Sequence, residues 1–280
     1  MTKNIDKKDY KYYTCRYDRA FKEVFIKDND TTLLKVLLES ILKVEINDIT
    51  IKNNELETDN VHVKQKLVDA ILYTDKGVIN VEVNTVMDDY VRVRNTAYIM
   101  NVYGRYYLRG EDYNKDDNFI QINFNYNLKK DYLIRDYKIR SDDEVLVDNF
   151  VIYDLNMDKY LEFWYNKDKK EIDAYKYLIM LDLPKEELSV LSKSDKVVSN
   201  YMEKLDNINE DPRFQSYMSA EEDDRKFMNS IKHEYFDKGI EQGAKEEKIE
   251  IARKMLDDGT EISIIEKYTG LSKEEVEELK

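Results

Sequence analysis

Ile79-Asn80-Val81-Glu82-Val83-Asn84 is the stretch that decides the fold, because its side chains alternate between apolar and polar along the chain. Successive side chains of a β-strand point to opposite faces of the sheet. The stretch therefore predicts a strand with one aliphatic face and one polar face that carries Asn80, Glu82 and Asn84. Glu82 thus has a defined place on the polar face of a sheet.

A second extended run covers residues 61–74, and Lys76-Gly77 lies between the two runs. These two residues are typical of a turn that joins adjacent antiparallel strands. Asp69 lies about as far before the turn as Glu82 lies after it, so we expect two carboxylates over one spot. Two carboxylates and a backbone carbonyl suit Mg²⁺ or Mn²⁺, which can activate a water for phosphodiester cleavage. The alternative is that both acids lie on an ordinary solvent-exposed face.

Motifs along nearly the whole chain carry a resemblance to a known family. Asp69 followed by Glu82-Val83-Asn84 has the arrangement of the PD-(D/E)XK motif. The other matching stretches occur in the expected order and are Tyr17-Asp18-Arg19-Ala20-Phe21-Lys22-Glu23-Val24-Phe25, Leu67-Val68-Asp69-Ala70, Arg94-Asn95-Thr96-Ala97-Tyr98, Gly110-Glu111-Asp112-Tyr113, Gly239-Ile240-Glu241-Gln242-Gly243, Ile251-Ala252-Arg253-Lys254-Met255-Leu256 and Thr269-Gly270-Leu271-Ser272. Through them the chain resembles the PD-(D/E)XK nuclease family of transposases and recombination-promoting nucleases.

The resemblance implies an α/β fold with a restriction-endonuclease-like core, in which helices flank a central mixed β-sheet, and an α-helical C-terminal extension. The alternation of predicted helices and strands agrees with an α/β fold. The resemblance also implies a Mg²⁺-dependent DNA endonuclease that hydrolyses phosphodiester bonds, with DNA as its partner. A second hypothesis is a catalytically weakened nuclease-like module that binds nucleic acid or protein within a mobile element or a defence system.

Roles for individual residues follow from the same resemblance. Asp69, Glu82 and the Val83 carbonyl would ligate the ion, and Asn84 would position the attacking water or the phosphate. No other cofactor is expected.

Accessory roles fall on two predicted helices. Lys22 or Arg94 would steady the scissile phosphate, and Tyr98 shares a helix face with Arg94 because the two are four residues apart. Asp18 would lie near the metal. Its alternative role is that of an N-cap or first-turn acid that favours the helix dipole.

Asn84 departs from the family pattern, which usually has Lys or Gln two residues after the glutamate. A lysine there would supply positive charge to the attacking hydroxide or to the scissile phosphate. Lys64 and Lys66 do not obviously replace it, since their parity relative to Asp69 sends them to the other face of the strand, and Lys22 is a better candidate. If Asn84 is a weakened replacement, Asn84→Lys or Asn84→Gln should raise cleavage.

The composition fits a folded protein of the cytoplasm. With 280 residues, of which 42% are hydrophobic and 12% aromatic, the chain can bury a full core as one large domain or as one domain with an appendage. Cys15 is the single cysteine, and no apolar segment follows the charged start, so we expect neither secretion nor a membrane span. The two histidines, His62 and His233, are too few and too far apart in sequence for a histidine-rich zinc site or a Ser/His/Asp triad.

The net charge of -14 is unfavourable for a protein that binds nucleic acid, because affinity for phosphates depends on Lys and Arg. We therefore expect basic residues to concentrate locally, in the stretch of Arg92, Arg94, Arg105 and Arg109, which lies on a helix over residues 90–108 and directly after it. The alternative is a solvated helix face with ordinary ion pairs.

Three regions are predicted along the chain: a nuclease-like core over residues 1–155, a helical region packed on it over 156–210, and a charged helical extension over 211–280. In the core, periodicity predicts a helix at 17–27, a second helix capped by Asp30, and strands at 45–52, 61–74, 79–84, 119–124 and 145–153. Asp211-Pro212 marks a break before the extension.

The end of the extension reads as a small helix-turn-helix, with Thr269-Gly270-Leu271 as the turn and Ser272-Lys273-Glu274-Glu275 as a capping box. A recognition helix presents Arg, Lys, Asn or Gln to bases, whereas residues 273–280 carry four glutamates. We therefore favour a protein contact or a homo-oligomer through the C-terminal helices over a DNA contact. The apolar stripe Leu271, Val276 and Leu279 would then be covered by the core, another copy or a partner.

Overall fold

The computed structural model describes residues 10–52, 55–56, 66–67, 70–87, 90–107 and 117–279, without the side chains of 55–56, 66–67, 226–241 and 244–245. The chain divides into two compact units, Met1–Ser216 and Tyr217–Lys280. The three regions expected from the sequence stay a prediction.

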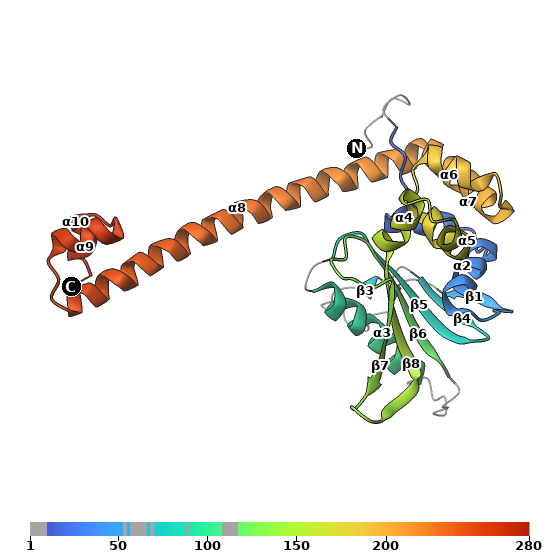
Figure 1. Ribbon diagram of the computed structural model, residues 1–280, viewed down its shortest axis with the longest axis horizontal. Helices are drawn as coiled ribbons and strands as arrows, with labels where there is room; N and C mark the ends of the chain where they lie inside the picture. The colour runs from blue at the N-terminus through green and yellow to red at the C-terminus, as the bar shows by residue number, and fades with distance from the viewer. Residues whose placement is uncertain are drawn as a thin grey trace. The chain divides into compact units, whose positions relative to one another are not determined.

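A mixed β-sheet forms the centre of the first unit (Figure 1). In the described part of the chain its six strands lie in the order β1 (Ile49–Lys52), β4 (Ala70–Thr74), β5 (Gly77–Asn84), β6 (Phe119–Asn125), β8 (Val145–Asn156) and β7 (Ile134–Arg140). The pairs β1/β4, β4/β5 and β7/β8 are antiparallel, and β5/β6 and β6/β8 are parallel. Strands β2 (Glu55–Leu56) and β3 (Lys66–Leu67) pair separately. The predicted α/β fold with a restriction-endonuclease-like mixed sheet is confirmed.

The hairpin between β4 and β5 depends on Gly77. Its φ is +121°, and a Cβ at this position would lie 2.2 Å from the Asn118 carbonyl oxygen. The Thr74 hydroxyl donates a hydrogen bond of 2.8 Å to the Gly77 carbonyl, which closes the turn. Ala70 then pairs with Val81 across the hairpin. A residue with a side chain at Gly77 would have to displace backbone, so the glycine sets this register.

The aliphatic face of the sheet is covered by α1 (Asp18–Phe25) and α2 (Thr32–Leu42). The core joins buried side chains of both helices to Val81, Ile122 and Leu155 of the sheet. Four more helices extend the same core: α4 (Met157–Tyr165), α5 (Lys169–Ile179), α6 (Lys185–Ser192) and α7 (Lys196–Glu210), with the short 3₁₀ helix η2 (Met180–Asp182) between α5 and α6.

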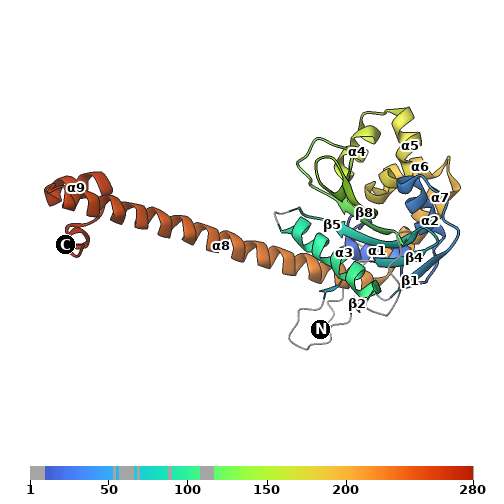
Figure 2. The same cartoon turned by 90° about the horizontal axis from the view of Figure 1, so that it is seen from below.

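Helix α3 (Val91–Tyr107) covers the opposite face, as Figure 2 shows. Its later turns bury Ile99 and Val102 against Phe119 and Phe150, near the beginnings of the parallel strands. Its first turns lie over the polar ends of these strands. The face under α3 is therefore apolar at one end and polar at the other.

Two local expectations differ from the structure. The N-cap of α2 is Thr31 and not Asp30, although Asp30 Oδ1 accepts a hydrogen bond of 3.1 Å from the Thr32 amide. The strand expected at 45–52 starts only at Ile49, since the backbone amide of Asn47 is instead bound by Asp75 Oδ1 over 2.9 Å. Both differences come from a carboxylate that binds backbone amides and so competes with regular structure.

The second unit ends in three helices that form their own small core. Helix α8 (Pro212–Asp257) starts at the predicted break and continues into this unit, where α9 (Ile262–Thr269) and α10 (Lys273–Glu277) follow it. The capping box at Ser272 and Glu275 is present, and Gly270 ends α9 with a φ of 70°.

The buried side chains of this small core are Ala252, Ile265, Leu271 and Val276, with Leu279 packed against them. The expectation that the core, another copy or a partner covers the stripe Leu271, Val276 and Leu279 is therefore wrong, since α8 and α9 cover it. None of the described helices is long and apolar enough to cross a membrane.

Candidate functional site

The polar face of β5 continues onto its two parallel neighbours. Strand pairing arranges the polar residues in three transverse rows: Asn80–Gln121, Glu82–Asn123–Asp154 and Asn84–Asn125–Asn156. All eight side chains are buried. The alternative in which Glu82 lies on a solvent-exposed face is therefore wrong, because the polar face is covered.

Hydrogen bonds between side chains connect the rows. The Asn80 amide donates to Gln121 Oε1 over 2.7 Å and to Glu82 Oε1 over 3.4 Å. Gln121 donates to Asn123 Oδ1, and Asn123 donates to Asp154 Oδ1, each over 2.7 Å. Two buried carboxylates, Glu82 and Asp154, are thus connected by a chain of amides. The amides of Gln121 and Asn123 each donate one hydrogen bond and accept another, which fixes their orientation.

The first turns of α3 are bound to these rows. Asn95 donates to Asn123 Oδ1 over 3.2 Å, and Arg92 Nη2 lies 3.3 Å from Asp154 Oδ2. Asp154 is 3% exposed, so the Arg92 guanidinium supplies the charge that a buried carboxylate needs. These contacts set the rotation of α3 above the sheet.

Asn84 is the last residue of β5, and its side chain binds the guanidinium of Arg94. Its Nδ2 donates to Asn125 Oδ1 over 2.9 Å, and its Oδ1 accepts from Arg94 Nη2 over 2.7 Å. Arg94 is otherwise exposed, and its Cζ lies 5.9 Å from the centre of the Tyr98 ring. Within the described ranges no carboxylate pairs with Arg94, whereas its neighbour Arg92 is neutralised by Asp154.

Glu82 lies one row away from Asn84 on the same face of β5, and it is 3% exposed. Asp69, its predicted partner, lies outside the described residues. The residue after it, Ala70, pairs with Val81, the residue before Glu82. Carboxylate and carbonyl oxygens such as those of Glu82 and Val83 suit a hard divalent cation. Among the described residues no three His, Cys, Asp or Glu side chains form a cluster that could hold a metal ion.

Lys22 and Asp18 form an ion pair of 3.1 Å on α1. This helix lies on the aliphatic face of the sheet, where Phe21 packs against Phe124 with 5.7 Å between ring centres. Asp18 is in the first turn of α1, and the N-cap is Tyr17. The predicted accessory residues thus belong to two helices on opposite faces, Asp18 and Lys22 to α1, Arg94 and Tyr98 to α3.

The expected basic stretch on α3 is not one patch. Arg105 lies in the last turn of the helix, about 16 Å along its axis from Arg94, because each residue adds about 1.5 Å. His62, Lys64, Asp69 and Arg109 lie outside the described residues, and so does the matching stretch Gly110-Glu111-Asp112-Tyr113. The side chains of Lys66 and His233 are not described either.

Sequence reasoning missed most of the polar rows. The signal was present, since β6 alternates Gln121, Asn123 and Asn125 with apolar residues in the same period of two as β5. Asp154 and Asn156 repeat the pattern at the end of β8. Three strands with one polar face each would have indicated a shared polar layer.

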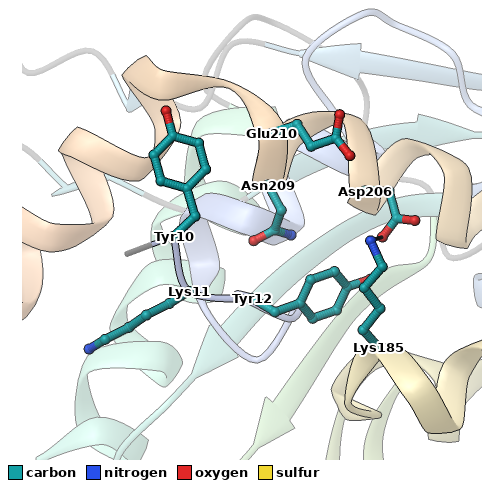
Figure 3. A pocket seen from close by; sticks show the side chains of 7 residues that line it. All are labelled: Tyr10, Lys11, Tyr12, Lys185, Asp206, Asn209 and Glu210. Atoms are coloured by element: carbon teal, nitrogen blue, oxygen red, sulfur yellow. Dashed lines mark ion pairs between the residues drawn. The ribbon is translucent and has the colours of Figure 1, made fainter. Parts of the chain in front are cut away.

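A pocket of about 470 Å³ lies elsewhere in the first unit, between the N-terminal segment, α6 and α7 (Figure 3). Lys185 pairs with Asp206 over 3.2 Å, and its Nζ lies 5.6 Å from the centre of the Tyr12 ring. The other lining residues are Tyr10, Lys11, Asn209 and Glu210. None of the residues predicted for catalysis or metal binding lines this pocket.

The sheet, its covering helices and the buried polar rows define a nuclease fold of the restriction-endonuclease-like class. Residues 15–234 match the family described as PD-(D/E)XK nuclease family transposase, and the chain belongs to this family. PD-(D/E)XK nucleases generally use divalent metal ions. Comparisons with curated proteins and with solved structures find no match.

Residues 245–280 match the C-terminal helix-turn-helix domain of the Rpn/YhgA-like nuclease family. The predicted resemblance to recombination-promoting nucleases and the helix-turn-helix at the chain end are confirmed. Helix-turn-helix domains are typical of DNA-binding proteins.

Proposed function

We propose that this protein is a Mg²⁺-dependent DNA endonuclease, for which Mn²⁺ can substitute, and that Arg94 supplies the positive charge that a lysine supplies elsewhere in the family. The observation that carries the proposal is the hydrogen bond of 2.7 Å from Arg94 Nη2 to Asn84 Oδ1, at the position of the family's Lys or Gln. Hydrolysis of a DNA phosphodiester fits the family and its helix-turn-helix domain.

Asp69, Glu82 and the Val83 carbonyl are the proposed ligands. Their support is the oxygen chemistry of the set and the register in which Ala70 pairs with Val81, next to Glu82. A divalent ion bound there would activate a water for attack and offset the negative charge of the phosphate. The amide of Asn80, 3.4 Å from Glu82 Oε1, helps to orient this carboxylate.

Arg94 is a better candidate than Lys22 for the group that steadies the scissile phosphate. Lys22 is paired with Asp18, whereas no carboxylate in the described ranges neutralises Arg94. A guanidinium also offers two parallel N–H donors, which match the oxygens of a phosphate. Asn84 is then a positioning residue for Arg94.

A cleavage assay on supercoiled plasmid tests this proposal. We expect nicking with Mg²⁺ or Mn²⁺, no nicking in EDTA, and loss of nicking in Asp69→Ala and Glu82→Gln with unchanged circular dichroism. Asp136→Asn is the matched control, because it removes an exposed carboxylate of β7. Asp136 is in register with Tyr153 of β8, so its side chain lies on the face of the sheet opposite to that of Glu82. Nicking that persists in EDTA or in Asp69→Ala overturns the site.

The second candidate function is a catalytically weakened nuclease-like module that retains nucleic-acid or protein binding. The burial of Glu82 favours it, because a carboxylate that is 3% exposed offers little access to a metal and its water. The net charge of -14 also weakens any approach of DNA. Calorimetric titration with Mg²⁺ separates the two functions. The endonuclease should lose Mg²⁺ binding in Glu82→Gln. The weakened module should bind DNA or protein, and Glu82→Gln should leave its Mg²⁺ titration unchanged.

The tail has two proposed roles. The family match favours a DNA contact, whereas the exposed Glu274, Glu277 and Glu278 of the last helix and its end favour a protein contact or self-association. We favour the protein contact, because negative charge on a recognition helix repels phosphates.

A further inference from the structure

Strand β7 extends one row of the polar layer beyond the residues considered so far. Arg135 pairs with Asp154 in the β7/β8 ladder, and Asp154 is in register with Asn123 and Glu82. Side chains that face each other across neighbouring strands point to the same side of a sheet. Arg135 therefore belongs to the row of Glu82 and lies about 14 Å from it, three strand spacings of about 4.8 Å away.

The Arg135 guanidinium rests on an aromatic ring. Its Cζ lies 4.3 Å from the centre of the Tyr132 ring, and the Tyr132 hydroxyl accepts a hydrogen bond of 2.8 Å from Arg92 Nη2. Arg92 in turn lies 5.8 Å from the centre of the Tyr137 ring. Burial, together with a hydrogen bond to Tyr137, raises the pKa of Tyr132 well above its usual value, so the hydroxyl stays protonated. The ring thus has a fixed orientation between two arginines.

Arg135 lacks the ion pair that three cations near it make. Arg92 pairs with Asp154 at 3.3 Å, Lys159 with Asp131 at 3.3 Å and Lys138 with Asp136 at 3.7 Å. No carboxylate of the described chain pairs with Arg135, which is exposed. Arg135 and Arg94 are thus two exposed arginines without an ion pair. Arg94 binds Asn84 of the polar rows, and Arg135 lies in register with the row of Glu82. In a protein with a net charge of -14, such cations mark where an anionic partner can approach.

We infer that Arg135, whose guanidinium packs on the Tyr132 ring, binds a backbone phosphate of the DNA strand that leads away from the Glu82 site. The inference rests on the proposed function, because it takes the substrate to be DNA and the reacting phosphodiester to lie at Glu82 and Arg94. A planar guanidinium carries a fork of N–H donors, which matches two oxygens of one phosphate. The separation of about 14 Å means that Arg135 contacts a phosphate other than the one that reacts.

Fluorescence anisotropy with a labelled DNA duplex tests the inference, in EDTA so that binding is measured without cleavage. Association constants are measured over a series of NaCl concentrations. For Arg135→Gln we expect the slope of log K against log salt to fall by about 0.9, the value for one lost phosphate contact. Arg135→Lys should keep the slope and lower the affinity, since the charge remains and the fork is lost.

Lys138→Gln is the matched control. Lys138 lies on the same strand but is in register with Val151, so its side chain is on the face opposite to that of Asp154. The substitution removes one positive charge, as Arg135→Gln does. We expect its salt slope to equal that of the wild type. Circular dichroism and light scattering accompany each variant.

Three results overturn the inference: an unchanged slope in Arg135→Gln, an equal decrease in Lys138→Gln, or a change in mass by light scattering with unchanged DNA binding. The last result would mean that Arg135 binds an acidic segment of a second copy. These failures are distinct from failure of the proposed function, which is decided by plasmid nicking in Asp69→Ala and Glu82→Gln.

Discussion

Arg94 contacts the motif strand through one hydrogen bond, in which its Nη2 donates to Asn84 Oδ1 over 2.7 Å. Asn84 uses its own Nδ2 for Asn125, 2.9 Å away, so the oxygen of its amide is directed to Arg94. The guanidinium is therefore held at the end of β5 while most of it stays exposed. This arrangement favours Asn84 as the holder of a cation over Asn84 as a defective replacement for one.

Replacing Arg94 by Gln should lower the rate of DNA cleavage about 100-fold, because one preorganised group that stabilises the reacting phosphate is lost. Arg94→Lys should retain part of the rate, since it keeps the charge without the fork. Single-turnover nicking of plasmid measures both. Arg105→Gln is the control, because it removes the same charge from the other end of α3. Equal rates in Arg94→Gln and wild type would show that Arg94 does not act on the phosphate.

Asn84→Lys should lower cleavage, contrary to the expectation from the family pattern alone. The new ammonium would lie beside the Arg94 guanidinium in a position where Asn84 is 2% exposed, and it would no longer accept a hydrogen bond from Arg94. The double variant Asn84→Lys with Arg94→Gln should cleave faster than either single variant, because one cation is then present. Nicking rates of the four proteins form the cycle. A several-fold gain in Asn84→Lys alone would restore the reading of Asn84 as a defect.

Local patterns in the sequence predicted the site strand and its hairpin, because alternation and a Gly77 turn are properties of neighbouring residues. The contact between Asn84 and Arg94 was not predictable in this way. It depends on the rotation of α3, which is set by the hydrogen bond from Asn95 to Asn123 and by the ion pair of Arg92 with Asp154. Asn123 and Asp154 belong to strands that are distant from α3 in the sequence. Pairing across parallel strands brings together residues that no local pattern connects.

Strand β7 shows the same limit at the edge of the sheet. Its sequence, Ile134 to Arg140, has charged residues on both faces, and the structure leaves four of these seven residues exposed as charged side chains. An edge strand buries little, so apolar alternation is weak and periodicity does not reveal it. Arg135 could therefore not be connected with Glu82 before the register of β7 on β8 was known.

The buried thiol of Cys15 should make stability depend on pH in the alkaline range. Burial raises the pKa of Cys15 from 9.0 to about 12. Below pH 9.0 the thiol is protonated in both the folded and the unfolded state. Between pH 9.0 and about 12 only the unfolded chain releases the proton. Wild-type stability should therefore fall as pH rises above 9.0, by about 1.4 kcal/mol per pH unit from this group.

Cys15→Ala isolates this contribution, since it lacks the thiol and loses some packing at every pH. Its stability deficit relative to wild type should shrink between about pH 8 and about pH 10 by about 1 kcal/mol. Urea unfolding of both proteins at each pH gives the difference. A deficit that stays constant across this range would mean that the thiol ionises equally in both states.

Lys267 and Lys273 of the C-terminal domain should not contribute to DNA affinity. Lys273 lies 3.8 Å from Glu277, and Lys267 lies 5.9 Å from the centre of the Tyr268 ring on a domain end that also exposes Glu274 and Glu278. The carboxylates around the two lysines offset the electrostatic attraction that either lysine could exert on a phosphate. We expect the double variant Lys267→Gln with Lys273→Gln to keep the wild-type slope of log K against log salt in the anisotropy measurement. Both lysines are exposed and outside the small core of Ala252, Ile265, Leu271 and Val276, so the tail should stay folded. A slope lowered by about 1 to 2 would instead identify the helix-turn-helix as a DNA contact, since each lost phosphate contact lowers it by about 0.9.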